Sequence, residues 1–559
     1  MASPMKVVIA FDFGTTYSGV SYAYRKPGVS PTAIIRWPGD SGRVLTDVKV
    51  PTIIAYTGPT DFKWGYQVKP GDKSIVGIKL LLDPDQDKPS YLPGSGKKTS
   101  LRNLPKPAVD VAADYIGAVY NHALGKIRES SVGNFFDKCE REVILTVPAV
   151  WSDKAKNLTL QAATKAGLGS VSMIKEPEAA AIYTLSEQAL ALQDGDICLI
   201  CDAGGGTVDL ITYEVAQSSP LELAEVVPGT GGMAGAIGLN KRFEDAVRDL
   251  IGEVQMATLK SVAGSWTTVL NQFETEIKRK FCGERYETYY VPFPGQRLED
   301  DQSENLVSNL WAMKCGDLHE IFDPLVRDVI RLIEEQVQAS RMKHPLRPIK
   351  AIFLVGGFGS NGYLKSRIEK DYAETQVVQP ANASSAIMNG AVMHCLTHGP
   401  KIVSRRATCH YGVVGWYVKK PEDEGRPESY DKKDGTTRVE KMGWHIIKGQ
   451  ELKEEKIKIN FSKAVDHPYT ISSLWNETTL YFSKADSPQV YPDPNVTKCC
   501  TLKTSLWGAR RNLRMIPVGA NGKPYWVMFF DLVVTAKANL HFSLEVNGTE
   551  YGSVEATYE

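Results

Sequence analysis

The chain has 559 residues, 43% hydrophobic and 23% charged, with Lys+Arg and Asp+Glu balanced at 65 each. This length predicts roughly three or four domain-sized units with ordinary hydrophobic cores. Zero net charge argues against a basic surface for nucleic acid or a membrane, so neither is expected as a partner.

In the first part of the chain, strands alternate with helices that are rich in alanine. A Pro/Gly/Lys-rich stretch, residues 83–104, is expected to be a surface excursion. The elements expected around it are two strands at 6–24, a buried strand at 141–153, and a strand leading into an Ala-rich helix at 174–185.

The same order of elements returns further along the chain. The elements expected there are a Gly-rich loop opening a helix (229–247), a strand, Gly turn and helix (349–369), and an Ala-rich helix (383–396). We therefore predict two similar halves, residues 1–188 and 189–400. Beyond them, alternating runs such as YWVMFFDLVVTA predict an all-β domain over 401–559, with a loop at the polar stretch 419–438.

The strongest single feature is a repeated strand and turn. VVIAFDFGTTYSGVSYAY (7–24) and ICLICDAGGGTVDLITYEV (197–215) align with each other, so that Asp12 falls on Asp202 and Gly14 on Gly204. Such a repeat indicates a duplicated unit. Backbone N–H groups of a tight Gly/Thr turn form a nest for phosphate, and the preceding Asp can hold the accompanying metal. The pair predicts a phosphate site built from both halves.

Cysteine usage and the apolar pattern bear on location. No apolar signal segment precedes the first strand, and no run reaches the roughly 18–20 apolar residues of a membrane helix. Nine cysteines in a chain of this length fit a reducing compartment, so a cytoplasmic location is expected. Cys198 and Cys201 form a CxxC, but positions i and i+3 of a strand face opposite ways, which favours packing over zinc or redox chemistry.

Five motifs carry a family likeness: FDFGTTYSGV, ILTVPAVW, IKEPEAAAIYTL, CDAGGGTVDL and FLVGGFGSNGYL. Their order and spacing resemble those of the heat-shock protein 70 chaperones and, more widely, of the actin/hexokinase/heat-shock-70 ATPase superfamily. The resemblance implies an α/β fold, with a duplicated actin-like two-lobed ATPase domain followed by a small all-β C-terminal domain. That last domain would be a degenerate substrate-binding domain.

The resemblance also implies the site. ATP or ADP would lie between the lobes, with Mg²⁺ at Asp12 and Asp202. Glu176 and Asp209 match the family's carboxylates near the attacking water, and Lys69 falls where the family carries its phosphate lysine. The residues implied to bind the nucleotide are Gly14, Thr15, Thr16, Tyr17, Gly204, Gly205, Gly206 and Thr207 at the phosphates, Gly356, Gly357 and Ser360 at the adenosine, and Lys278 and Arg279 beside the base. Thr207 would also be a hydrogen-bond partner in hydrolysis.

Simpler interpretations stand beside these roles. Glu176 could cap the Ala-rich helix that follows it, Lys69 could be a solvated loop lysine, and Lys278 with Arg279 could be plain helix surface.

The chain also departs from the chaperone pattern. Ser384 and Ser385 replace an acidic residue, and Phe358 stands where a small polar residue is usual. Residues 401–416 replace the leucine linker, and no helical lid is expected after the β runs.

The leading hypothesis is an ATP-binding protein of this superfamily that hydrolyses Mg-ATP slowly and uses lobe closure to modulate a protein partner, as a chaperone does. The client is not specified by the sequence, and a co-chaperone or nucleotide-exchange partner is implied only by the resemblance. A nucleotide-sensing scaffold with negligible turnover is the alternative. A small-molecule kinase is a third, although no motif for its catalytic Asp is found.

Overall fold

The computed structural model describes residues 5–26, 28–69, 71–83, 104–131, 133–187, 192–262, 264–396, 399–432, 435–453, 456–466, 468–517, 522–536 and 540–553. It divides into two compact units, Met1–Ile402 and Val403–Glu559. Most of the excursion expected at 83–104 lies outside the described residues. Within them, no helix is long and apolar enough to cross a membrane.

The first sheet of the first unit has the strand order β11-β10-β1-β2-β3, with β6 paired to β2. β1 runs antiparallel to β2 and parallel to β10. Its alternate residues serve two cores, because Val7 and Ile9 lie on one face and Val8 and Ala10 on the other. The bounds are β1 Lys6–Asp12, β2 Tyr17–Tyr24, β3 Thr32–Ala33, β6 Val50–Pro51, β10 Glu140–Val147 and β11 Val171–Lys175, with helices α2 Ala108–Ser130 and α3 Asp153–Lys165 on the outer face.

The second sheet repeats this arrangement, with β19-β18-β12-β13-β14 in order. β12 runs antiparallel to β13 and parallel to β18, as β1 does to β2 and β10, which confirms the predicted duplication. Cys198 and Cys201 belong to the cores on opposite faces, as expected for a packing role. The bounds are β12 Ile197–Ala203, β13 Val208–Ser218, β14 Leu221–Gly232, β18 Ile349–Val355 and β19 Gln376–Val378.

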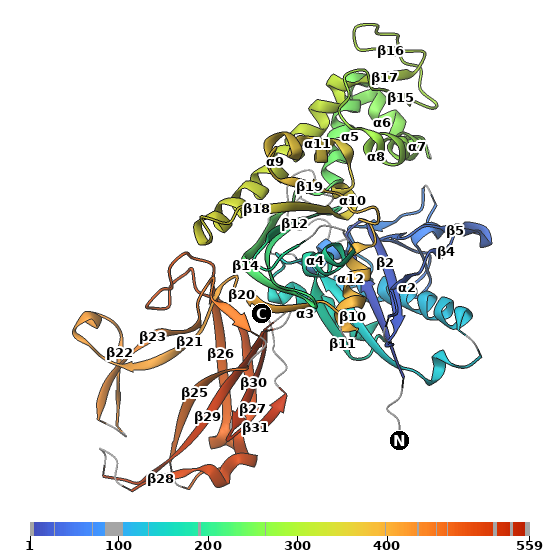
Figure 1. Ribbon diagram of the computed structural model, residues 1–559. Coiled ribbons are helices and arrows are strands. Elements are labelled where there is room, and N and C mark those ends of the chain that lie inside the picture. The colour runs from blue at the N-terminus through green and yellow to red at the C-terminus, as the bar shows by residue number, and fades with distance from the viewer. Residues whose placement is uncertain are drawn as a thin grey trace. The chain divides into compact units, whose positions relative to one another are not determined.

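Two Ala-rich helices, α4 (Glu176–Glu187) and α12 (Ala386–Cys395), form a layer between the two sheets (Figure 1). Small residues let them approach closely: a Cβ on Gly390 would lie 1.8 Å from the carbonyl oxygen of Ala179. α12 packs on β1 and β2 of the first sheet, and α4 packs on β12 of the second sheet and β11 of the first, so that all share one core. This layer therefore joins the lobes and holds the first residue of α4, Glu176, at the ends of their strands.

Helices and small sheets cover the outer parts of both lobes. The second lobe carries α5 Ile237–Ile251, α6 Glu253–Ser261, α7 Ser265–Gln272, a π-helical turn Phe273–Ile277, α8 Lys278–Lys280, α9 Cys315–Lys343, α10 Gly356–Gly359 and α11 Gly362–Asp371, with strands β15 Thr288–Pro292, β16 Leu306–Val307 and β17 Leu310–Lys314. The first lobe adds β4 Arg36–Pro38, β5 Val44–Thr46, β7 Ile53–Tyr56, β8 Phe62–Trp64 and β9 Ile75–Val76.

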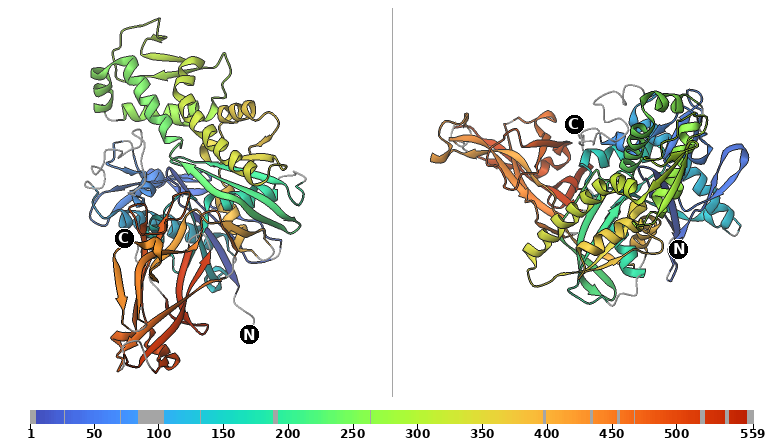
Figure 2. Two further views of the ribbon diagram at one scale, coloured as in Figure 1. Left: turned by 90° about the vertical axis from the view of Figure 1, so that its left-hand side faces the viewer. Right: turned by 90° about the horizontal axis from the view of Figure 1, so that it is seen from above.

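The second unit is built from strands, and Figure 2 shows them running as long ribbons. One sheet has the order β22-β23-β21-β26-β27 and the other β25-β29-β30-β31, around a single hydrophobic core. The loop predicted at 419–438 is wrong in part, because it contains β22 and the start of β23. The bounds are β20 Lys401–Arg406, β21 His410–Val418, β22 Glu428–Asp431, β23 Thr436–Ile446, β24 Glu451–Lys453, β25 Lys456–Asp466, β26 Trp475–Ser483, β27 Thr497–Ser505, β28 Arg514–Ile516, β29 Tyr525–Ala536, β30 Leu540–Val546 and β31 Thr549–Ser553.

Candidate active site

The two Gly/Thr turns of the repeat face each other. A Cβ on Gly205 would lie 2.2 Å from the hydroxyl of Thr16, and one on Gly206 would lie 2.8 Å from the hydroxyl of Thr15. Only glycine leaves room for so close an approach of two chain segments. The fold thus brings residues from both halves of the chain to one place.

The second turn is fixed from behind by the loop that opens α5. The backbone N–H groups of Gly235, Ala236 and Ile237 donate to the carbonyls of Gly206, Gly204 and Gly205 at 3.2, 3.1 and 2.8 Å. Because a peptide's N–H points away from its C=O, anchoring these carbonyls turns the N–H side of the turn in the other direction. Such oriented N–H groups suit an anion.

Four buried carboxylates lie beneath the turns. Asp12 ends β1, Glu176 begins α4, Asp202 lies near the end of β12 and Asp209 near the start of β13. Each is at most 6% exposed. They act on one another electrostatically, since Asp12, Glu176 and Asp209 all contribute to the pKa of Asp202.

Two lysines enter this carboxylate cluster. Lys49 Nζ lies 2.6 Å from Asp12 Oδ2, and Lys79 Nζ lies 2.5 Å from Glu176 Oε1. Lys79 is itself buried and stacks over the ring of Trp151 at 5.4 Å. These pairs offset part of the cost of burying charge.

The pKa values of three carboxyl groups in this cluster are raised. Burial raises the pKa of Glu176 to about 7 although Lys79 opposes the shift, and Asp12 and Asp209 add to it. Burial and the neighbouring carboxylates raise the pKa of Asp202 well above its usual range. Burial also raises the pKa of Asp209, against hydrogen bonds from Thr207 and the Val150 N–H. Burial is the largest cause in each case, so these carboxyl groups are costly to ionise without added positive charge.

This cluster fits an added divalent cation. Four carboxylates face two ammonium groups, and among the described residues no hydrogen-bond partner reaches the buried Oδ1 of Asp202. No three acidic, His or Cys side chains in the described ranges are placed to enclose a metal by themselves. A hard cation that keeps some of its waters and takes further oxygens from a phosphate would balance the carboxylates. It would not need three side chains of the protein as ligands.

The lysine expected from the sequence is not in the cluster. Lys69 is half-exposed and pairs with Asp40 at 2.7 Å, so the simpler interpretation of a solvated loop lysine describes it. Sequence reasoning missed Lys79 and Lys49. A signal for Lys79 was present, because a single lysine inside the apolar run 78–82 must find a buried partner.

The turn expected to cradle adenosine also borders the cluster. Gly356 has a φ of 83°, and a Cβ on it would lie 2.4 Å from Asp202 Oδ1. Gly357 and Ser360 belong to the same turn, and the Ser360 hydroxyl donates to the Gly357 carbonyl at 2.8 Å. Phe358 points into the hydrophobic core of the second lobe, so its size does not bear on the adenosine side.

The basic pair Lys278 and Arg279 follows the π-helical turn, a feature often found at functional sites. Lys278 donates to Asn240 Oδ1 at 2.8 Å, and burial lowers its pKa to about 8. Arg279 is exposed, and it is close enough to the first turn to act on Tyr17, because its charge opposes the rise that burial causes in the Tyr17 pKa. The plain helix-surface interpretation therefore does not describe Lys278.

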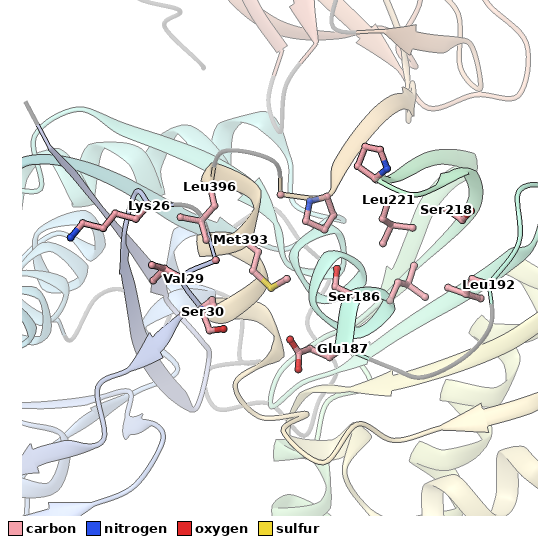
Figure 3. Close-up of a pocket in the computed structure, with 16 residues that line it drawn as sticks. Lys26, Val29, Ser30, Ser186, Glu187, Leu192, Ser218, Leu221, Met393 and Leu396 are labelled. Carbon is pink, nitrogen blue, oxygen red and sulfur yellow. The ribbon is translucent and has the colours of Figure 1, made fainter. Parts of the chain in front are cut away.

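The described part of the first unit holds several cavities, of which two are lined by residues from both halves of the chain. One of about 540 Å³ adjoins the first turn, with Thr15, Thr16 and Tyr17 on one side and Asn240 and Glu274 on the other. The other, of about 600 Å³, is drawn in Figure 3 and is lined by parts of both halves, but by no residue of either turn or of the carboxylate cluster. Of these two, only the first adjoins a Gly/Thr turn of the repeat.

Two repeated α/β lobes, with facing Gly/Thr turns and a shared helical layer, define a duplicated actin-like two-lobed ATPase fold followed by a β-rich unit. Residues 110–406, more than half of the chain, match the family model described as Hsp70 protein. The chain belongs to this Hsp70 family, which is a family of ATP-binding proteins.

Individual relatives are distant but similar over most of their length. The chain is 25% identical to Heat shock 70 kDa protein 12A of Homo sapiens, over 90% of this chain and 85% of that protein. It is 25% identical to the Mus musculus 12A protein over 91% and 87% of the two chains, and 25% identical to human Heat shock 70 kDa protein 12B over 89% and 84%.

Proposed function

We propose that this protein binds Mg-ATP between its two lobes, hydrolyses it slowly, and uses lobe closure to modulate a protein partner in a chaperone-like manner. The observation that carries the proposal is the meeting of both Gly/Thr turns above one cluster of four buried carboxylates. The cluster sits where a terminal phosphate would lie. Family membership supports the nucleotide as the ligand.

The chain's residues divide the work of hydrolysis. Glu176 and Asp209 orient and deprotonate the attacking water, and a carboxyl with a pKa of about 7 suits a proton acceptor near neutral pH. Thr207 supports Asp209, and Lys79 takes the role of phosphate lysine in place of Lys69. Asp12 and Asp202 would hold Mg²⁺, which supplies positive charge to the phosphates when bound.

For the nucleotide itself, the proposed contacts keep the residues expected from the family motifs. The turn residues hold the phosphates, and Gly356, Gly357, Ser360, Lys278 and Arg279 hold the adenosine. The proposed lobes are residues 1–188 and 189–400.

The proposed effect on a protein partner comes from movement of the lobes, outside the catalytic cluster. Because the layer formed by α4 and α12 packs on both sheets, a change in the angle between the lobes must pass through this layer. Residues 401–559 are proposed as a degenerate substrate-binding domain. A cytoplasmic site of action is supported by the nine free cysteines.

Single-turnover hydrolysis of Mg-ATP tests the proposal, with Glu176→Gln and Asp209→Asn as the informative variants. We expect each variant to bind ATP and to lose roughly 100-fold or more in rate. Glu187→Gln, an exposed residue on the same helix, is the matched control. Binding without turnover in the unmodified protein would instead establish the nucleotide-sensing scaffold, and absence of ATP binding would refute both.

A further inference from the structure

Lys49 is a lysine of the first lobe whose side chain is directed into the carboxylate cluster. It lies just before β6, and its side chain is 16% exposed. Its backbone is held on two sides, by the Asp47 carboxylate on its N–H at 3.4 Å and by the Tyr66 hydroxyl on its carbonyl at 3.2 Å. Its stem passes beside Gly19 of β2, where a Cβ would lie 3.2 Å from Lys49 Cγ. The ammonium is therefore held in place by the fold.

The two aspartates of the repeat differ in their hydrogen-bond partners. Asp12 Oδ2 accepts from Lys49 at 2.6 Å, and its Oδ1 accepts from the Thr146 hydroxyl at 3.0 Å. Asp202 is the equivalent residue of the second half, and among the described residues no partner reaches its Oδ1. The duplication has thus become asymmetric, with a tethered cation at one aspartate only.

The Lys49 ammonium is placed against negative charge, because its Nζ lies 2.6 Å from Asp12 Oδ2 in the cluster that also contains Asp202 and Glu176. An ammonium has three N–H donors, and Asp12 Oδ2 takes one of them. A phosphate held by the turn beginning at Gly14 would meet a positive charge that belongs to the protein.

We propose that Lys49 is a tethered cation at Asp12 that supplies, from the chain, part of the neutralisation a metal ion would provide, so that the protein binds nucleoside phosphates with little dependence on divalent cations. The inference rests on the proposed nucleotide site and specifies its ligand further, to include the metal-free nucleotide. Mg²⁺ then matters at Asp202 and for hydrolysis more than for affinity.

Calorimetric titration with ATP, in Mg²⁺ and in EDTA, tests this role in the unmodified full chain. We expect the two affinities to agree within about fivefold. Lys49→Met should weaken binding in EDTA roughly tenfold or more, as for the loss of a charge-assisted hydrogen bond, and should weaken it less in Mg²⁺. Lys49→Arg, which keeps the charge, should restore most of the metal-free binding and shows that the position tolerates substitution.

Lys63→Met is the matched control, because Lys63 pairs with Asp72 at 3.1 Å in the same lobe but outside the cluster. It should leave the ratio of the two affinities unchanged. A wild-type affinity that falls 100-fold or more in EDTA would overturn the role of Lys49 while leaving the proposed function standing. So would equal losses for Lys49→Met in both buffers. No binding in either buffer would refute the nucleotide site itself.

Discussion

Replacing Glu176 by glutamine should stabilise the nucleotide-free protein at pH 8 while it removes hydrolysis. Glu176 is 6% exposed, and burial raises its pKa from 4.5 to about 7 even with Lys79 beside it. Because the pKa is higher in the folded than in the unfolded chain, the stability that this group contributes is full below about pH 4.5. It is lost as the pH rises through about 7.

The size of the effect follows from the same two values. A rise from 4.5 to about 7 corresponds to about 3 kcal/mol of folding free energy by pH 8. Glutamine matches the protonated acid in shape and charge, and it keeps an oxygen that accepts from Lys79. The variant therefore avoids the cost of ionisation without losing that contact.

Urea unfolding without nucleotide, from pH 5 to pH 8.5, measures this difference. We expect Glu176→Gln to exceed the wild type by about 3 kcal/mol at pH 8 and to approach it near pH 5. Glu187→Gln, exposed on the same helix, should differ from the wild type by about 0.5 kcal/mol at most. A variant that is less stable at pH 8, or a difference that does not vary with pH, would refute the argument.

Two further predictions concern the lysine assignment and the helical layer. Lys79→Met should reduce single-turnover hydrolysis roughly 100-fold, and by far more than Lys69→Met, because only Lys79 contacts Glu176; equal losses would return the assignment to Lys69. Gly390→Ala should destabilise the protein by about 3 kcal/mol in urea unfolding, because its Cβ would lie 1.8 Å from a backbone oxygen of α4 that cannot move alone. Gly125→Ala in α2, where a Cβ meets open space, should instead be neutral or slightly stabilising.

Much of the fold was predictable because its signals are local. The continuous apolar runs that became β1 and β12, each followed within two residues by a glycine, depend only on neighbouring residues. The Ala-rich segments that became α4 and α12 show the need for close packing in their composition alone. The predicted loop at 419–438 failed in part because polar, half-exposed strands such as β22 lack a clear apolar alternation.

The amino-acid sequence by itself determined the duplicated strand-turn repeat, the residues of its two Gly/Thr turns and the carboxylates beside those turns. Only the tertiary structure decided which lysines meet those carboxylates, since Lys79 finds Glu176 across 97 residues and Lys49 finds Asp12 across 37. A turn is set by short-range backbone sterics, which a sequence pattern displays. A buried ion pair depends instead on which distant segments the fold brings together. Burying either charge without the other is unfavourable in free energy.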